Sequence, residues 1–296
     1  MDNASDLDLA TLDPREPIDA VQEWNGRAFT FEVDSSPLAW KFHILMAADS
    51  PFLQEYDTEH LTGIKFDDSG CVQEADLEKC REKRLFATHR TIFEDRAWYR
   101  LSGDTCFNFN EWKVEQFAKV VDEDQCLSPE RRAFLRKKLD GCADMHHSCT
   151  NLALMQSYGN LQGVKGGYRL PGETPGKYGF DRLDTFLYNL HDYYGLSEED
   201  NRWNAEILKS ARCIPGRAIE RRPQLMGFLS QFNDIYDYAE QVYQIDRELT
   251  DALIVNGAIP INDGESLERY MDLAEKFWDA RCKAFERKLA EGFMTK

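Results

Sequence analysis

Apolar residues recur at intervals of three and four along much of the chain, which is the spacing of one face of an α-helix. In the second half this pattern predicts helices over residues 181–195, 224–249 and 266–290. The first begins at Asp181, a good N-terminal cap, and closes at Gly195, since glycine is common where a helix ends. The C-terminal half is therefore expected to be a bundle of helices.

The first half of the chain has further helical patterns and a few short β-prone segments. The clearest helix start is Ser128-Pro129-Glu130, because a hydroxyl cap, a proline at the first helical position and an early acid all favour a helix N-terminus. Up to residue 155 we predict helices over residues 37–45, 76–93, 110–121 and 129–139, and strands over residues 29–33, 98–101 and 151–155.

The fold class that follows is mainly α with a minor β element (α+β), in which a helical C-terminal half packs on a small strand and loop unit. We divide the chain into an acidic, flexible arm over residues 1–25, a mostly helical N-terminal half over 26–145, and a third part over 146–296 with a strand, a glycine-rich loop and the helical bundle. A single domain over 26–296 is the alternative, since single cores stop growing at about 250 to 300 residues.

The net charge narrows the range of partners. The 296 residues include 53 acidic and 36 basic side chains, a formal charge of −17. Broad binding of nucleic acid or anionic membranes needs an excess of Lys and Arg, so both are disfavoured. The sequence has no apolar run of about 18 residues, no signal-peptide pattern at its start and no close cysteine pair. We expect a soluble cytoplasmic protein with no membrane contact.

A glycine-rich segment forms a basic island in this acidic chain. Residues 159–179 hold seven of the 18 glycines, and residues 159–182 carry four basic and two acidic side chains. Glycine backbones let several N–H groups converge on an anion, and nearby Lys and Arg can complete such a site. A solvated connector with tight turns is the alternative. The predicted ligand-binding residues are Lys165, Gly166, Gly167 and Arg169 as anion contacts, with Asp181 and Arg182 as the loop anchor, held by an ion pair that includes Asp184.

Several segments follow one another in a familiar order. Asn160 to Lys165-Gly166 precedes Asp181-Arg182-Leu183-Asp184, and an aromatic helix around Phe232 comes after them. This order resembles an uncharacterised family of bacterial domains of unknown function, in which an Asn-x-x-x-(Arg/Lys)-Gly loop is followed by an Asp-Arg-(Phe/Leu)-Asp helix. The resemblance covers residues 150–246 and a patch from Ser36 to His43, and it implies a fold unit but no reaction.

His147, Asn151 and Asn160 form a second pattern, at the spacing of a His-x-x-x-Asn-Leu-x-Leu-Leu segment with a further Asn nine residues after the first. The pattern is similar to nucleases of the His-Me finger type. It implies that these three residues are catalytic, with a histidine that activates water and a divalent metal as cofactor. Those enzymes also carry an upstream acid-His-x-x-Pro segment, whereas His43 has neither the acid nor the proline. The alternative is that His146 and His147 are partly exposed residues at a helix-to-strand junction.

Three classes of function follow from these patterns. The leading hypothesis is a protein that binds a phosphate-bearing or otherwise anionic small molecule in the region 146–182. The second is an acidic interaction protein of the defence or counter-defence type, whose partner is a basic protein. The third is the metal-dependent nuclease. The sequence does not decide whether the protein is an enzyme, and it identifies no metal ligands.

Overall fold

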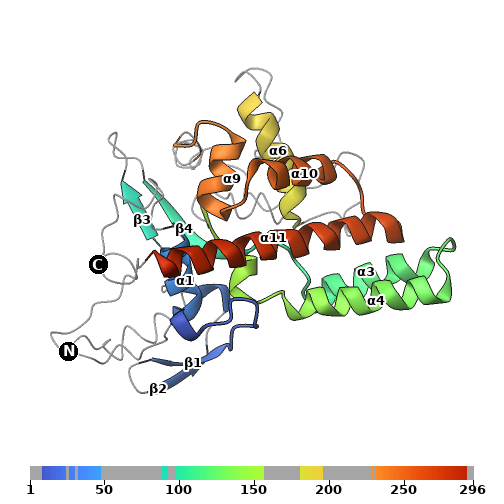
Figure 1. Ribbon diagram of the computed structural model, residues 1–296, viewed down its shortest axis with the longest axis horizontal. Coiled ribbons are helices and arrows are strands. Elements are labelled where there is room, and N and C mark those ends of the chain that lie inside the picture. Colours follow the sequence, from blue (N-terminus) through green and yellow to red (C-terminus); the bar gives the residue numbers. More distant parts are fainter. Residues whose placement is uncertain are drawn as a thin grey trace, which may run out of the picture.

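Over the residues that the structure describes, the fold is mainly helical and has two small antiparallel sheets (Figure 1). The computed structural model describes residues 9–24, 27–30, 33–47, 89–92, 98–156, 181–195, 229 and 231–291. Its α-helices are α1 (Pro37–Ala47), α3 (Glu111–Glu123), α4 (Pro129–Asp144), α6 (Leu183–Gly195), α9 (Ile235–Tyr243), α10 (Arg247–Gly257) and α11 (Gly264–Ala290). Its strands are β1 (Val21–Trp24), β2 (Arg27–Thr30), β3 (His89–Ile92), β4 (Trp98–Thr105) and β5 (Leu152–Gln156). The mainly α class with a minor β element is confirmed.

The long helix α11 is the element around which the others pack. In Figure 1 it runs through the middle of the described elements, with α3 and α4 against its first half on one side and α10 on the other. One apolar cluster joins Phe117 and Leu135 from the N-terminal half to Phe186 and Tyr270 from the C-terminal half. The described parts of the two halves therefore share a core. Among these residues, no helix is both long and apolar enough to cross a membrane.

The buried side chain of Arg281 links α11 to β5 and to α9 through hydrogen bonds. This residue is 1% exposed, and its Nε and Nη2 donate to the carbonyl oxygens of Thr150 and Leu152 at 2.9 and 2.6 Å. Its Nη1 donates to the carbonyl oxygen of Tyr243 at 2.9 Å. The guanidinium also lies 5.7 Å from the ring centroid of Phe42 in α1. Removal from water lowers the pKa of Arg281 from its usual value.

A second buried arginine joins α6 to the end of α10. Nε and Nη2 of Arg182 donate to the two carboxylate oxygens of Asp184 at 3.0 and 2.6 Å, and neither side chain is exposed. Arg182 also donates to the carbonyl oxygen of Ile259 at 2.9 Å, and Asp184 accepts from Nδ2 of Asn256 at 2.8 Å. The predicted ion pair with Asp184 is thus present, and its charges are satisfied inside the protein.

In the three-stranded sheet, β4 lies between β3 and β5, antiparallel to both. Thr105 of β4 pairs with Leu152 of β5, and Leu101 pairs with His89 of β3. Leu152 and the three residues after it are all buried, because β5 has α1 and α9 packed against it. The predicted strand over 151–155 is therefore confirmed with its start one residue later.

Residues 9–24 pack on the core, although the sequence predicts a flexible arm there. Leu9 and Ile18 are only 2% and 6% exposed, and the backbone N of Ile18 donates to the carbonyl oxygen of His147 at 3.0 Å. The expectation fails for this stretch because Asp13, Glu16 and Asp19 point to solvent while Leu9 and Ile18 point inward. Residues 1–8 lie outside the described part.

The single helix expected over residues 224–249 is wrong in the described part, where a turn over residues 231–234 is followed by two helices. Residues 224–228 and 230 lie outside the described part. α9 ends at Tyr243, Gln244 adopts a left-handed φ of 56°, and α10 begins after its cap, Asp246. The apolar stripe does not reveal this break, because Ile245 is also buried and continues the period.

The predicted helix over 76–93 is wrong at its end, where residues 89–92 form β3. Pairing with β4 overrides the local helical pattern in this segment. Residues 76–88 lie outside the described part. The cap predicted at Ser128 is confirmed, since its Oγ accepts from N of Arg131 at 3.2 Å. The helix predicted from Asp181 begins at Leu183 in the structure, so Asp181 is not its N-cap.

Replacing Asp184 with Asn should lower the free energy of unfolding by about 3 to 5 kcal/mol, because it leaves the buried guanidinium of Arg182 without a counter-charge. Urea denaturation followed by circular dichroism measures the change. The control is Arg136→Ala, which breaks an exposed pair with Asp122 and should cost less than about 1 kcal/mol. Equal effects of the two substitutions would contradict the role given to the buried pair.

Candidate functional site

Asn151, one of the predicted catalytic residues, has its whole amide group engaged inside the protein. It ends the short helix η6 (Cys149–Asn151). Its Oδ1 accepts from the backbone N of Phe107 and from Nε1 of Trp278, both at 2.9 Å. Its Nδ2 donates to the carbonyl oxygens of Phe107 and His146, both at 2.8 Å. An amide has two donors and two acceptor positions, so none is left for a metal ion or a substrate.

His147 is the predicted catalytic residue that lies at the surface. Its ring stacks on that of His146 with centroids 4.4 Å apart. Partial burial lowers the pKa of His147, and the nearby Asp34 opposes this effect. Asn160, the third predicted catalytic residue, lies outside the described residues. Within the described part, no three His, Cys, Asp or Glu side chains gather into a group able to hold a metal ion.

His43, the histidine of the upstream segment, is closed off from solvent. It is 1% exposed and lies against β4 at Gly103, where an added Cβ would meet its Nε2 at 2.9 Å and the carbonyl oxygen of Asp34 at 2.0 Å. Burial lowers the pKa of His43 to about 3, and the positive charge of Arg281 acts in the same direction. The ring is therefore neutral at neutral pH.

The predicted anion contacts Lys165, Gly166, Gly167 and Arg169 lie outside the described residues. The structure does describe the end of their segment. Oδ2 of Asp181 accepts from Nδ2 of Asn108, and Arg182 forms a β-bridge with Phe107. Asp181 has a left-handed φ of 60°, and the guanidinium of Arg182 is held by Asp184. The two residues join this end of the segment to the residues that follow β4.

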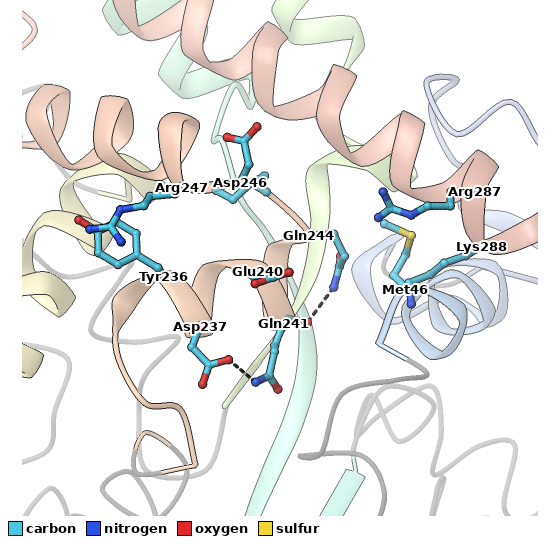
Figure 2. A pocket seen from close by; sticks show the side chains of 11 residues that line it. Met46, Tyr236, Asp237, Glu240, Gln241, Gln244, Asp246, Arg247, Arg287 and Lys288 are labelled. Atoms are coloured by element: carbon cyan, nitrogen blue, oxygen red, sulfur yellow. Dashed lines mark hydrogen bonds between the residues drawn. The ribbon is translucent and has the colours of Figure 1, made fainter. Parts of the chain in front are cut away.

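A cavity of about 720 Å³ lies between α9, the end of α1 and the last turns of α11 (Figure 2). Its apolar lining comes from Met46 of α1 and Ile245 of the α9–α10 connection, both buried. Its charged lining consists of three acidic and three basic side chains: Asp237, Glu240, Asp246, Arg247, Arg287 and Lys288. The cavity is therefore polar and has no net formal charge.

The acidic side of the cavity is the outer face of α9. Oδ2 of Asp237 accepts from both N and Nδ2 of Asn233 at 2.8 Å, and its Oδ1 accepts from Nε2 of Gln241. Glu240 is exposed, and its carboxylate makes no hydrogen bond or ion pair with any other described residue. Glu240 is thus the acid of this face that is available to a ligand.

The basic side of the cavity is the C-terminal end of α11. Figure 2 shows Arg287 and Lys288 beside Met46, on the opposite side of the cavity from Asp237. Lys288 is 7% exposed, whereas Arg287 is exposed. The guanidinium of Arg287 has no hydrogen bond or ion pair to any other residue in the described ranges. The helix dipole favours cations at this end.

Gln244 connects the cavity to the buried Arg281. Its Oε1 accepts from Nη1 of Arg281 at 2.9 Å, and its Nε2 donates to the carbonyl oxygen of Gln241 at 2.8 Å. Both polar atoms of the Gln244 amide are therefore held in place. Gln244 forms the middle of the cavity wall (Figure 2), so this part of the wall is fixed as well.

This cavity could not be predicted from the sequence, because its residues come from separate segments and share no local motif. The one local signal is Asp246, a good helix cap placed inside a stripe that was interpreted as continuous helix. In comparisons with protein-family models, with curated proteins and with solved structures, nothing matches the chain.

Replacing Asn151 with Ala should lower the free energy of unfolding by at least about 2 kcal/mol, because it leaves the buried donors and acceptors around Phe107 and Trp278 without partners. Urea denaturation measures the loss. The matched control is His191→Ala on the exposed side of α6, which should change the same free energy by less than about 0.5 kcal/mol. An Asn151 variant as stable as the control would show that this amide does not hold the fold.

The burial of His43 predicts a pH dependence of stability. Between pH 7 and 5 the unfolded chain protonates this ring with its ordinary pKa, while the folded chain, with a pKa of about 3, does not. Protons therefore stabilise the unfolded state, and the wild type should lose about 2 kcal/mol of unfolding free energy more than His43→Gln over this range. Denaturation curves at both pH values measure the difference, and identical pH profiles would contradict the assignment.

Proposed function

We propose that the protein binds a small molecule with an anionic group, and that this ligand occupies the cavity between α9 and the end of α11. The observation that carries the proposal is the exposed Arg287 in a cavity of about 720 Å³, without a counter-charge in the described part of the chain. Pockets for small ligands have volumes of about 300 to 1,000 Å³. The proposal concerns binding and assigns no reaction.

The chemistry of the basic side suits a phosphate or a carboxylate. A guanidinium presents its donors in a planar fork that matches both groups, and Lys288 adds a second positive charge beside it. Met46 and Ile245 supply apolar surface that excludes water from one side of the cavity, which strengthens the electrostatic interactions. An anionic small molecule is also the ligand class that the sequence predicts. The proposed site, however, is this cavity and not the glycine-rich segment.

The rival functions gain less support. Acids along α11 are paired with cations inside the protein: Asp272 and Glu275 bind Lys138 at 2.6 and 2.8 Å, and Asp279 binds Arg15 at 2.6 Å. Because these acids are already paired, the surface of α11 does not favour docking of a basic partner protein. The nuclease hypothesis is weakened because the amide of Asn151, one of its three predicted catalytic residues, is fully hydrogen-bonded within the protein.

A cytoplasmic location is part of the proposal. It is supported by the cysteines of the described part, which are all free thiols, because reducing compartments keep thiols unpaired. These residues are Cys106, Cys126, Cys142, Cys149 and Cys282.

Arg287→Ala should reduce anion binding at least about tenfold, since charge-assisted hydrogen bonds contribute about 1.5 to 3 kcal/mol. The probes are inorganic phosphate, glycerol 3-phosphate and citrate, measured by isothermal titration calorimetry and by the rise in melting temperature. Arg269→Ala removes an exposed arginine of the same helix outside the cavity and should bind as the wild type does. The proposal fails if none of the probes binds, or if Arg287→Ala binds them unchanged.

A further inference from the structure

The two sides of the cavity present opposite charges that do not meet each other. Glu240 belongs to α9 and Arg287 to α11, and Figure 2 shows Gln244 between them. Neither Glu240 nor Arg287 makes an ion pair in the described ranges, with the other or with a third residue. Opposite charges held apart along one cavity give it a dipolar electrostatic field.

The other charges around the cavity are engaged within the protein. The guanidinium of Arg247 lies 4.0 Å from the ring centroid of Tyr236, and Asp246 caps α10 through the backbone N of Leu249 at 2.9 Å. Asp237 is held by Asn233 and Gln241, as described above. The exposed charged groups without a hydrogen bond, ion pair or ring contact in the described part are therefore Glu240 on one side and Arg287 on the other, whereas Lys288, beside Arg287, is only 7% exposed.

The space between these charges has a fixed and neutral wall. Gln244 is held at both ends, by Arg281 and by the backbone of Gln241, and its left-handed backbone sets the direction of its side chain. Met46 and Ile245 add apolar surface. A wall that is ordered before binding lowers the entropic cost of binding.

We infer that the ligand of this cavity is a zwitterion, with its phosphate or carboxylate group at Arg287 and its ammonium group at Glu240. This inference rests on the proposed function and specifies its ligand. A simple anion would approach three carboxylates, and a simple cation would approach three basic groups. A molecule with both charges compensates each unpaired group and matches the zero net charge of the lining.

Two pairs of probes test the inference by isothermal titration calorimetry. Phosphoethanolamine and ethyl phosphate differ in one ammonium group, as do 4-aminobutyrate and butyrate. Within the pair whose anion fits, we expect the zwitterion to bind at least about tenfold more tightly than its partner. Comparison of the two pairs tells whether the anion is a phosphate or a carboxylate.

Glu240→Gln should remove the preference for the zwitterion over the simple anion, and it should not weaken binding of the simple anion, because it only removes a repelling carboxylate. Since Glu240 is exposed, this variant should fold normally. Glu248→Gln, on the exposed face of α10 outside the cavity, is the control and should change neither affinity. Equal binding of zwitterion and anion, with no effect of Glu240→Gln, overturns the zwitterion while the anion site stands. If none of the four probes binds in a way that depends on Arg287, both proposals fail.

Discussion

The guanidinium of Arg281 constrains the rest of the described structure. Arg281 is only 1% exposed, and all three nitrogens of its guanidinium donate to oxygens of Thr150, Leu152, Tyr243 and Gln244. These oxygens carry no formal charge, so the buried cation is stabilised by dipoles that must all be in place together. α11, β5 and the end of α9 therefore have one arrangement in which this charge is satisfied.

The same constraint shapes the cavity. Because Arg281 holds both the carbonyl oxygen of Tyr243 and the side chain of Gln244, the chain turns at this point and α9 does not continue into α10. The turn leaves the outer face of α9 opposite the last turns of α11, and Glu240 and Arg287 face the same space (Figure 2). The hydrogen bonds of Arg281, which stabilise the core, thus also position the walls of the proposed binding cavity.

What could be predicted from the sequence is what depends on neighbouring residues. Ser128 and the apolar stripe of α11 define their helices locally, and both helices form as expected. The break at Gln244 depends on Arg281, 37 residues further along, and its one local sign is the helix cap Asp246 inside an apolar stripe that looks continuous. The cavity brings together α1, α9 and α11, which only tertiary packing places side by side. Spacing singled out Asn151 as a catalytic residue, whereas its contacts in the structure explain it through packing.

A crystal structure of the protein with phosphoethanolamine would test the central claim most directly. The account predicts the phosphate within hydrogen-bonding distance of Arg287 and the ammonium group beside Glu240, with Gln244 still bonded to Arg281. Density for the ligand elsewhere, with this cavity empty at saturating concentration, would contradict it.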